Sequence, residues 1–250
     1  VRGHTAAVDA VCWHPSHAAV LASASSDKTV RLWDVRSNHC MTTIATRGEN
    51  LNMSWSTDGS TLVVGDRDDL LTTLDTRALT ARPAKEGAKA TKVKKCSKYD
   101  VEVNQVAFAV GMDVVFVTTG HKSGGMDEGV VEVLRVLPDG SLDPLKSVLA
   151  HTGTVYAIDV ERSGRYFATG GADGNVNIFD AVEVACVRTY DRLDKPLRAL
   201  SFSHDGEFIA TGSEDLFVDI FRTRDGARVR ALPTGVEGCV TCAVAWHPRA

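Results

Sequence analysis

A histidine, a hydroxyl residue and an aspartate recur at similar spacing, and these are the residue types of a hydrolytic triad. The residues concerned are His4, Ser23 and Asp27, followed by His151, Thr169 and Asp173. A nucleophilic serine needs a sharp exposed turn and an oxyanion partner, and no serine in this register has that setting. We therefore predict that these groups hydrogen-bond to one another inside the fold, because a buried imidazole or carboxylate is costly without a partner.

Other sequence signatures of catalysis and cofactor binding are absent, including a P-loop, a dinucleotide glycine fingerprint, His-Glu-x-x-His and EF-hand spacing. Cys239 and Cys242 have the spacing of a zinc-binding pair, but a strand over Cys239–Trp246 would point them to opposite faces. The other cysteines are expected to be reduced thiols that pack as small apolar residues, namely Cys12, Cys40, Cys96 and Cys186. We predict no enzymatic activity, no cofactor, no metal site and no small-molecule substrate.

The elements that must position these groups are short strands in a repeating pattern. The expected first strands end at Trp13, Trp55, Phe108, Val160, Phe202 and Trp246. A later strand of each repeat is marked by Leu32–Asp34, Thr73–Asp75, Val133–Arg135, Ile178–Asp180 and Ile220–Arg222. Repeats of about 40 to 45 residues with this strand pattern are typical of the blades of a β-propeller.

The first repeat resembles a WD repeat, with Gly3-His4 before the first strand and Leu32-Trp33-Asp34 at the end of the third. In WD repeats a His, a Ser or Thr, an Asp and a Trp form a hydrogen-bonded chain that holds the blade together. The first repeat matches all four positions, the fourth has Phe179 in place of Trp, and the fifth has Leu193 in place of His. The predicted chain members are His4, Ser23, Asp27, Trp33, His151, Thr169, Asp173, Thr211 and Asp215.

The expected architecture is an all-β WD40 β-propeller fragment that occupies residues 1–250 as a single domain. The blades are expected at about 1–45, 46–100, 101–150, 151–190 and 191–235, with a partial sixth at 236–250. The chain begins at Val1 without an initiator Met, and it stops just after the first strand of the sixth repeat. We therefore expect a piece of a longer chain that has seven blades when complete, because an unpaired blade would leave an open sheet edge.

The charge of the chain is unevenly distributed. The net charge is −4, yet residues 82–98 carry seven cations and a single Glu86. We expect a basic loop insertion here, and the simpler interpretation is a solvated loop beside an edge strand, where lysines discourage strand pairing. The alternative is a weak, non-specific RNA contact through Lys92, Lys94 and Lys95, although few aromatic residues accompany them. No apolar stretch approaches about 18 residues, so no membrane partner is expected.

Three segments are less generic than the repeat itself. They are Cys12–Arg36, Thr46–Gly59 and Cys186–Asp215, and the chain ends on Ala245-Trp246-His247-Pro248. In order and spacing they resemble the Tex1-type WD-repeat subunits of the THO complex, and the resemblance covers nearly the whole chain. It implies a nuclear, non-enzymatic scaffold whose partners are other THO/TREX subunits. It also implies a role in coupling transcription to mRNA processing, packaging and nuclear export.

Loops at one face of a rigid propeller are where partner recognition is expected. The candidate contact residues are Thr5, Ser26, Lys28, Glu49, Asn50, Arg192, Lys195 and Glu214. The alternative interpretation is that each of them is simply a solvated loop residue without a partner-binding role. A second function also stays open, because Trp33-Asp34-Val35-Arg36 resembles the box with which substrate receptors of cullin-4 ubiquitin ligases present an Arg to their adaptor. A G-protein β-like or kinase-anchoring scaffold fits the fold but none of the distinctive segments.

Overall fold

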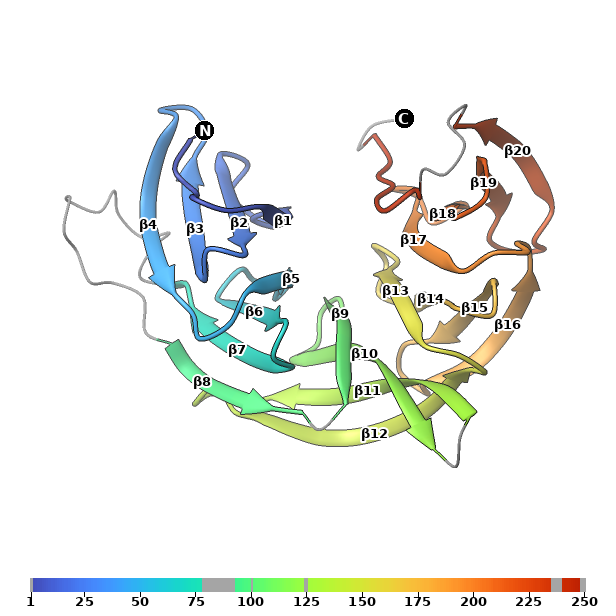
Figure 1. Cartoon of the computed structure of the whole chain (residues 1–250), viewed down its shortest axis with the longest axis horizontal. Helices are drawn as coiled ribbons and strands as arrows, with labels where there is room; N and C mark the ends of the chain where they lie inside the picture. Colours follow the sequence, from blue (N-terminus) through green and yellow to red (C-terminus); the bar gives the residue numbers. More distant parts are fainter. Residues whose placement is uncertain (1, 78–92, 100, 124–125, 235–239, 248–250) are drawn as a thin grey trace. The chain divides into compact units, whose positions relative to one another are not determined.

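The computed structural model describes residues 2–77, 93–99, 101–123, 126–234 and 240–247. In this part of the chain twenty strands form five four-stranded antiparallel sheets, which confirms the expected all-β propeller blades (Figure 1). The chain divides into two compact units, which we describe separately. Unit 1 comprises Val1–Phe116 and Leu134–Leu145, and unit 2 comprises Val117–Val133 and Lys146–Ala250.

The first two sheets lie in unit 1, and in each the strands follow one another in chain order. The first sheet contains β1 (Val8–Trp13), β2 (Val20–Ser25), β3 (Thr29–Asp34) and β4 (His39–Ala45). The second contains β5 (Asn50–Trp55), β6 (Thr61–Asp66), β7 (Leu70–Asp75) and β8 (Val93–Lys98). Short turns join most successive strands into hairpins, whereas residues 76–92 separate β7 from β8.

The third sheet has the order β12-β11-β10-β9, and the division between the units falls within β10, β11 and β12. Its strands are β9 (Glu102–Phe108), β10 (Val114–Ser123), β11 (Met126–Val136) and β12 (Leu142–His151). β10 and β11 have 10 and 11 residues, whereas strands of six or seven residues make up the other four sheets. The extra residues of the third repeat therefore lengthen this hairpin.

Unit 2 contains the fourth and fifth sheets, again with their strands in chain order. The fourth has β13 (Val155–Val160), β14 (Tyr166–Gly171), β15 (Asn175–Asp180) and β16 (Ala185–Asp191). The fifth has β17 (Leu197–Phe202), β18 (Phe208–Ser213), β19 (Phe217–Arg222) and β20 (Arg228–Pro233). The five first strands end at the predicted residues.

The sixth predicted strand is not formed, so the expectation of a strand over Cys239–Trp246 is wrong for the residues that the structure describes there. Residues 240–247 lie against the fifth sheet without belonging to it. The Thr241 amide donates to Ser213 O at 3.1 Å, and the Trp246 indole Nε1 donates to Ser201 O at 2.9 Å. A strand needs a neighbour to satisfy its backbone groups, and no described strand pairs with this segment.

The predicted basic loop over 82–98 is also partly wrong. Its last six residues, Val93–Lys98, form β8, the outer strand of the second sheet. β8 pairs antiparallel with β7, and Leu70 lies opposite Lys98 in the register. The pairing satisfies the backbone of β7, which explains why a lysine-rich sequence adopts a strand here. Residues 82–92 of the predicted insertion lie outside the described residues.

Within each unit, one face of a sheet packs on the opposite face of the next. Small residues of the first sheet, such as Ala22 and Ala24, meet larger residues of the second, such as Trp55. In unit 2, Ala157 and Ala168 of the fourth sheet belong to a cluster with Phe202 and other large residues of the fifth. Apolar burial of this kind is the main stabilising force of the fold.

The outer face of β1 carries large apolar side chains like those of the other first strands. In the described part of unit 1, however, no sheet packs against this face. Trp13 ends β1 as Trp55 ends β5 and Phe202 ends β17. The exposed fraction of Trp13 is 57%, against 8% for Trp55 and 6% for Phe202. Val11 is 62% exposed, although its position two residues before the strand end is buried in β5 as Met53. This face is therefore an exposed apolar patch whose counterparts are covered.

A carboxylate joins the fourth sheet to the fifth in unit 2. Asp159 precedes the last residue of β13, and its Oδ2 accepts a hydrogen bond from the Phe202 amide at 2.8 Å. Ser54 has the corresponding place in β5, and its hydroxyl accepts from the Phe108 amide at 3.0 Å. Burial raises the pKa of Asp159 to about 6, against the opposing effect of its hydrogen bonds.

This raised pKa predicts a pH effect on the stability of unit 2. Because folding favours the protonated form, the stability falls as the pH rises from about 4, the ordinary pKa of an aspartate, to about 6, the pKa in the folded state, and it returns as the pH falls through the same window. Asp159→Asn keeps an acceptor oxygen without the charge. We expect it to raise the free energy of unfolding by about 1 to 2 kcal/mol at pH 7.5, allowing for partial solvent screening.

Urea unfolding of wild type and variant at pH 7.5 and pH 5.0 measures this difference. The advantage of Asp159→Asn should shrink toward pH 5.0, while Asp194→Asn, at an exposed carboxylate of the same unit, should show no such trend. An Asn variant that is destabilised equally at both pH values would contradict the prediction.

Candidate functional site

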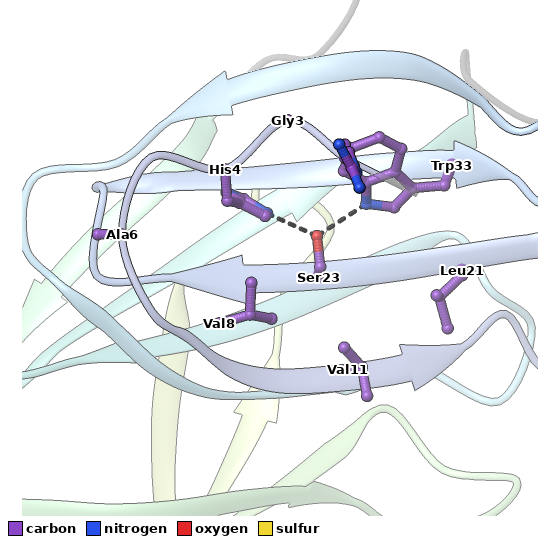
Figure 2. Close-up of a pocket in the computed structure, with 9 residues that line it drawn as sticks. Gly3, His4, Ala6, Val8, Val11, Leu21, Ser23 and Trp33 are labelled. Atoms are coloured by element: carbon purple, nitrogen blue, oxygen red, sulfur yellow. Dashed lines mark hydrogen bonds between the residues drawn. The ribbon is translucent and has the colours of Figure 1, made fainter.

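The first blade contains the predicted chain of polar side chains, and Figure 2 shows His4 and Trp33 both directed at Ser23. The Trp33 indole Nε1 donates to Ser23 Oγ at 2.8 Å, and Ser23 Oγ lies 2.7 Å from His4 Nε2. The other ring nitrogen, His4 Nδ1, lies 2.8 Å from Asp27 Oδ2. Because an ionised carboxylate only accepts, Nδ1 carries the proton and Nε2 accepts from the serine hydroxyl.

The turn between β2 and β3 anchors this chain through Asp27. Its Oδ1 accepts from the Thr29 hydroxyl at 2.6 Å and from the Thr29 amide at 3.0 Å, while Oδ2 also accepts from the Thr5 amide at 3.1 Å. Burial opposes ionisation, but the hydrogen bonds from Thr29 and His4 outweigh it and lower the pKa of Asp27. The serine oxygen is thus buried between His4 and Trp33, which is a structural arrangement and not that of an exposed nucleophile.

Removing the central hydroxyl is expected to destabilise the first blade. Ser23→Ala leaves Trp33 Nε1 and His4 Nε2 without their partner, and each lost buried hydrogen bond costs roughly 1 to 2 kcal/mol. We therefore expect a loss of about 2 to 3 kcal/mol in the free energy of unfolding, measured by urea denaturation. The control is Ser26→Ala, which removes an exposed bond to Asp9 Oδ2 and should cost less than about 0.5 kcal/mol. Equal effects of the two variants would refute the assignment.

A pocket of about 420 Å³ opens beside the first polar chain (Figure 2). Val8, Val11 and Leu21 contribute apolar walls, and the polar walls come from Arg2, His4, Ser23 and Trp33. The ring nitrogens and the hydroxyl are already bonded to one another. The pocket is therefore a largely apolar hollow on the exposed face of β1, with the exposed Arg2 as its charged lining residue.

The fourth blade forms the same chain with one member fewer, as its sequence predicts. His151 Nδ1 lies 2.9 Å from Asp173 Oδ1, and Nε2 lies 2.8 Å from Thr169 Oγ1. Burial opposes ionisation, but the hydrogen bond and charge of His151 together with the amides of Asn175 and Thr152 lower the pKa of Asp173. Phe179 stacks on Phe167 with ring centroids 4.9 Å apart, so packing replaces the indole hydrogen bond.

The fifth blade differs from the prediction, because Thr211 and Asp215 are not linked by a histidine. The Thr211 hydroxyl donates to Asp219 O at 3.3 Å, and Asp215 Oδ2 accepts from the Ser213 hydroxyl at 3.0 Å. Among the described residues of this blade, the buried charged group is the Asp219 side chain, which is fully buried.

Two arginines surround the Asp219 carboxylate. Arg192 Nε donates to Oδ2 at 3.1 Å, and Arg228 Nε donates to Oδ1 at 2.7 Å. Arg192 also donates to Gly226 O at 3.0 Å, and its side chain is only 17% exposed. The prediction that Arg192 is a partner contact on an open loop is therefore wrong, because its guanidinium is committed to an ion pair inside the blade. Sequence reasoning missed both Asp219 and Arg228.

The other predicted contact residues fall into three groups. Thr5, Lys28, Lys195 and Arg36 are exposed. Ser26, Glu49 and Glu214 are engaged on the surface, by Asp9, Arg67 and Arg198 respectively. Asn50 is 1% exposed, and its side-chain amide nitrogen Nδ2 donates a hydrogen bond to Ser25 O at 3.1 Å. The prediction of a surface contact at Asn50 is therefore wrong. Asn50 begins β5, where its side chain ties the second sheet to the first.

One surface arrangement was not predicted. The Arg198 guanidinium lies 4.0 Å from the ring centroid of Tyr156 and donates twice to Glu214 Oε1, at 2.8 and 3.1 Å. Tyr156 and Arg198 are both second residues of their first strands, in neighbouring repeats. This shared repeat position was the only sequence signal that could have found the pair. Half-buried tyrosine and arginine side chains are common in protein interfaces.

The described part of the chain has no cluster of three or more His, Cys, Asp or Glu side chains that could hold a metal ion. The described cysteines are unpaired, and burial raises the pKa of the Cys12 thiol to about 12. Cys239 of the predicted Cys239 and Cys242 pair lies outside the described residues. In the described part of the chain no helix is long and apolar enough to cross a membrane.

Comparison with known proteins places this geometry in a family. The family model "WD domain, G-beta repeat" matches residues 1–34, 142–180 and 184–221. THO complex subunit 3 of Arabidopsis thaliana is 39% identical over 249 residues, which cover 100% of this chain and 71% of that protein. The chain belongs to the THO complex subunit 3 family of WD-repeat proteins.

Other relatives of this THO complex subunit 3 family member are more distant. WD repeat-containing protein AAC3 of Dictyostelium discoideum is 30% identical over 208 residues, which are 82% of this chain and 40% of that protein. The serine-threonine kinase receptor-associated protein of Homo sapiens is 24% identical over 222 residues, covering 81% of this chain and 63% of that protein. The repeat matches cover the first, fourth and fifth repeats and omit the second blade, whose central hydroxyl position is Val64.

Proposed function

We propose that this chain is part of a non-catalytic scaffold subunit of a THO/TREX-type assembly in the nucleus. In that role it contacts other subunits and helps to couple transcription to the processing, packaging and export of mRNA. The observation that carries the proposal is the 39% identity to THO complex subunit 3 along 100% of the chain.

The chemistry of the described residues supports a binding role. The triad-like groups are engaged in holding blades together, as the Trp33, Ser23, His4 and Asp27 contacts illustrate. Exposed side chains on rigid turns, such as Lys28 and Lys195, leave room for partner contact. The Arg198 stack on Tyr156 adds a pre-ordered contact point in unit 2, which loses little conformational entropy on binding.

The test is affinity purification of the tagged full-length protein from nuclear extract, followed by mass spectrometry. We expect other THO subunits to be recovered with it. Tyr156→Ala combined with Arg198→Ala should reduce their recovery, and Lys146→Ala, a surface change in the same unit, should leave it unchanged. Absence of every THO subunit from the wild-type sample would reject the assembly role itself.

The alternative is a cullin-4 ligase receptor that presents Arg36. Arg36 is 79% exposed, and its Nε and backbone amide lie 3.4 and 2.9 Å from Asp34 Oδ1. The same Asp-x-Arg pairing recurs at Asp75 and Arg77, where Leu74 replaces the Trp of the box, and this recurrence favours a general turn motif. Recovery of a cullin adaptor that is lost with Arg36→Ala, in place of THO subunits, would establish the alternative.

A further inference from the structure

A pocket of about 410 Å³ lies between the outer strands of the first two blades in unit 1. Ala45, Thr46 and Arg47 line it from the end of β4, and Thr72 lines it from β7. Val93, Lys95 and Cys96 complete it from β8. The pocket is thus formed by two neighbouring repeats, and none of its lining residues belongs to the polar chains of the first and fourth blades.

The lining of this pocket is basic and hydroxylated. Arg47 and Lys95 are both exposed and supply the two charges, and none of the described lining residues is acidic. Among the described residues, Arg47 makes no hydrogen bond or ion pair. Thr46 and Thr72 add hydroxyl groups, which donate to Gly48 O and Cys96 Sγ.

Glu49 and Asp139, which lie close to these cations in the chain or in space, have partners of their own. Glu49 follows Arg47 in the chain but lies 3.4 Å from Arg67 Nη1. Asp139 is held chiefly by Ser141, whose hydrogen bonds lower the pKa of its carboxyl, and Lys95 adds a smaller electrostatic contribution. Because both cations line one pocket, an anion that binds between them interacts favourably with both.

We propose that this pocket binds the phosphodiester backbone of a nucleic acid strand. Phosphate oxygens are contacted chiefly by Arg and Lys side chains, and the exposed Arg47 and Lys95 are the groups of this kind in the pocket. Arg offers a planar fork that matches a phosphate, and Lys offers a point charge. None of the described lining residues is aromatic, so binding is independent of base sequence. The proposal does not depend on membership in a THO assembly.

The test is the salt dependence of binding to fluorescein-labelled U20 RNA by the full chain, followed by fluorescence anisotropy between 50 and 300 mM KCl. Each phosphate contact to a single strand contributes about 0.7 to the slope of log K against log salt. The Arg47→Gln and Lys95→Gln double variant should therefore have a slope smaller by about 1.4, with weaker binding at 50 mM KCl. The matched control is Lys28→Gln with Arg36→Gln, which removes two exposed cations outside the pocket and should reduce the slope much less.

The outcomes separate the proposal from general electrostatic attraction. A phosphodiester site is supported if wild type binds U20 and dT20 with equal affinity. It is also supported if wild type prefers one of these strands and the pocket variant loses that preference. The proposal is wrong if wild type binds neither strand at 50 mM KCl, or if the control variant loses as much slope as the pocket variant. Equal competition by a poly-glutamate peptide would show that the site takes acidic protein segments, and would also overturn it. Circular dichroism checks that both double variants are folded.

Discussion

Asp219→Ala should lower the free energy of unfolding of unit 2 by about 3 kcal/mol. The substitution removes a fully buried carboxylate and leaves the Arg192 and Arg228 guanidinium groups without their shared partner. Breaking a buried ion pair from one side costs roughly 3 to 5 kcal/mol, because the remaining charge is left uncompensated. The lower end applies here, because the Arg228 side chain is 48% exposed and can be solvated. Urea denaturation followed by circular dichroism measures the change.

The matched control is Asp215→Ala, at the position where the repeat pattern places the carboxylate of the polar chain. The Asp215 side chain accepts one hydrogen bond, from Ser213, so its loss should cost about 1 kcal/mol or less. The two variants remove the same group four residues apart, which makes their difference informative. If Asp215→Ala costs as much as Asp219→Ala, then the blade relies on the repeat position and our interpretation of the ion pair is incorrect.

Gly174→Ala should destabilise the fourth blade by about 2 to 3 kcal/mol. Gly174 has a φ of 75° in the turn after Asp173, and an L-residue in this left-handed region costs roughly 1 to 2 kcal/mol. An added Cβ would also collide with the backbone oxygen of Leu193, which cannot move as a flexible side chain could. Thermal unfolding of the variant should show a correspondingly lower Tm.

The first blade supplies the reverse experiment at the same turn position. Lys28 has a φ of 63° there, so Lys28→Gly relieves the backbone cost. We expect this variant to be more stable than wild type by about 0.5 to 1 kcal/mol, with the opposite sign to Gly174→Ala. A loss of stability in Lys28→Gly would mean that the lysine side chain contributes more than its backbone conformation costs.

Periodicity made the architecture predictable. The five first strands end where the sequence places an aromatic or branched residue, from Trp13 to Phe202. In β5 and β17 that residue, Trp55 or Phe202, is buried in the packing between sheets. The polar chains of the first and fourth blades were predictable for a related reason. Each of their members is fixed to one position of the repeat, so spacing alone brings His4 to Asp27 and His151 to Asp173.

The departures come from contacts that no repeat position defines. The ion pairs of Asp219 join a residue of β19 to Arg192 before the fifth sheet and to Arg228 in β20, and only the three-dimensional register brings them together. Asn is a residue type common in loops, but the side-chain amide of Asn50 donates a hydrogen bond to Ser25 O of the preceding sheet. The strand β8 was not predicted because its lysine-rich composition favours a loop. In the structure, hydrogen bonding to β7 favours a strand.

The uncovered face of β1 gives the molecule a built-in optical reporter. Trp33 and Trp55 are buried, whereas Trp13 is 57% exposed, so Trp13 should contribute long-wavelength indole emission and be the most accessible to a collisional quencher such as acrylamide. A partner that covers the exposed face of β1 should shift the emission of Trp13 to the blue and reduce quenching of Trp13 by acrylamide. Trp13→Phe provides the blank for such measurements.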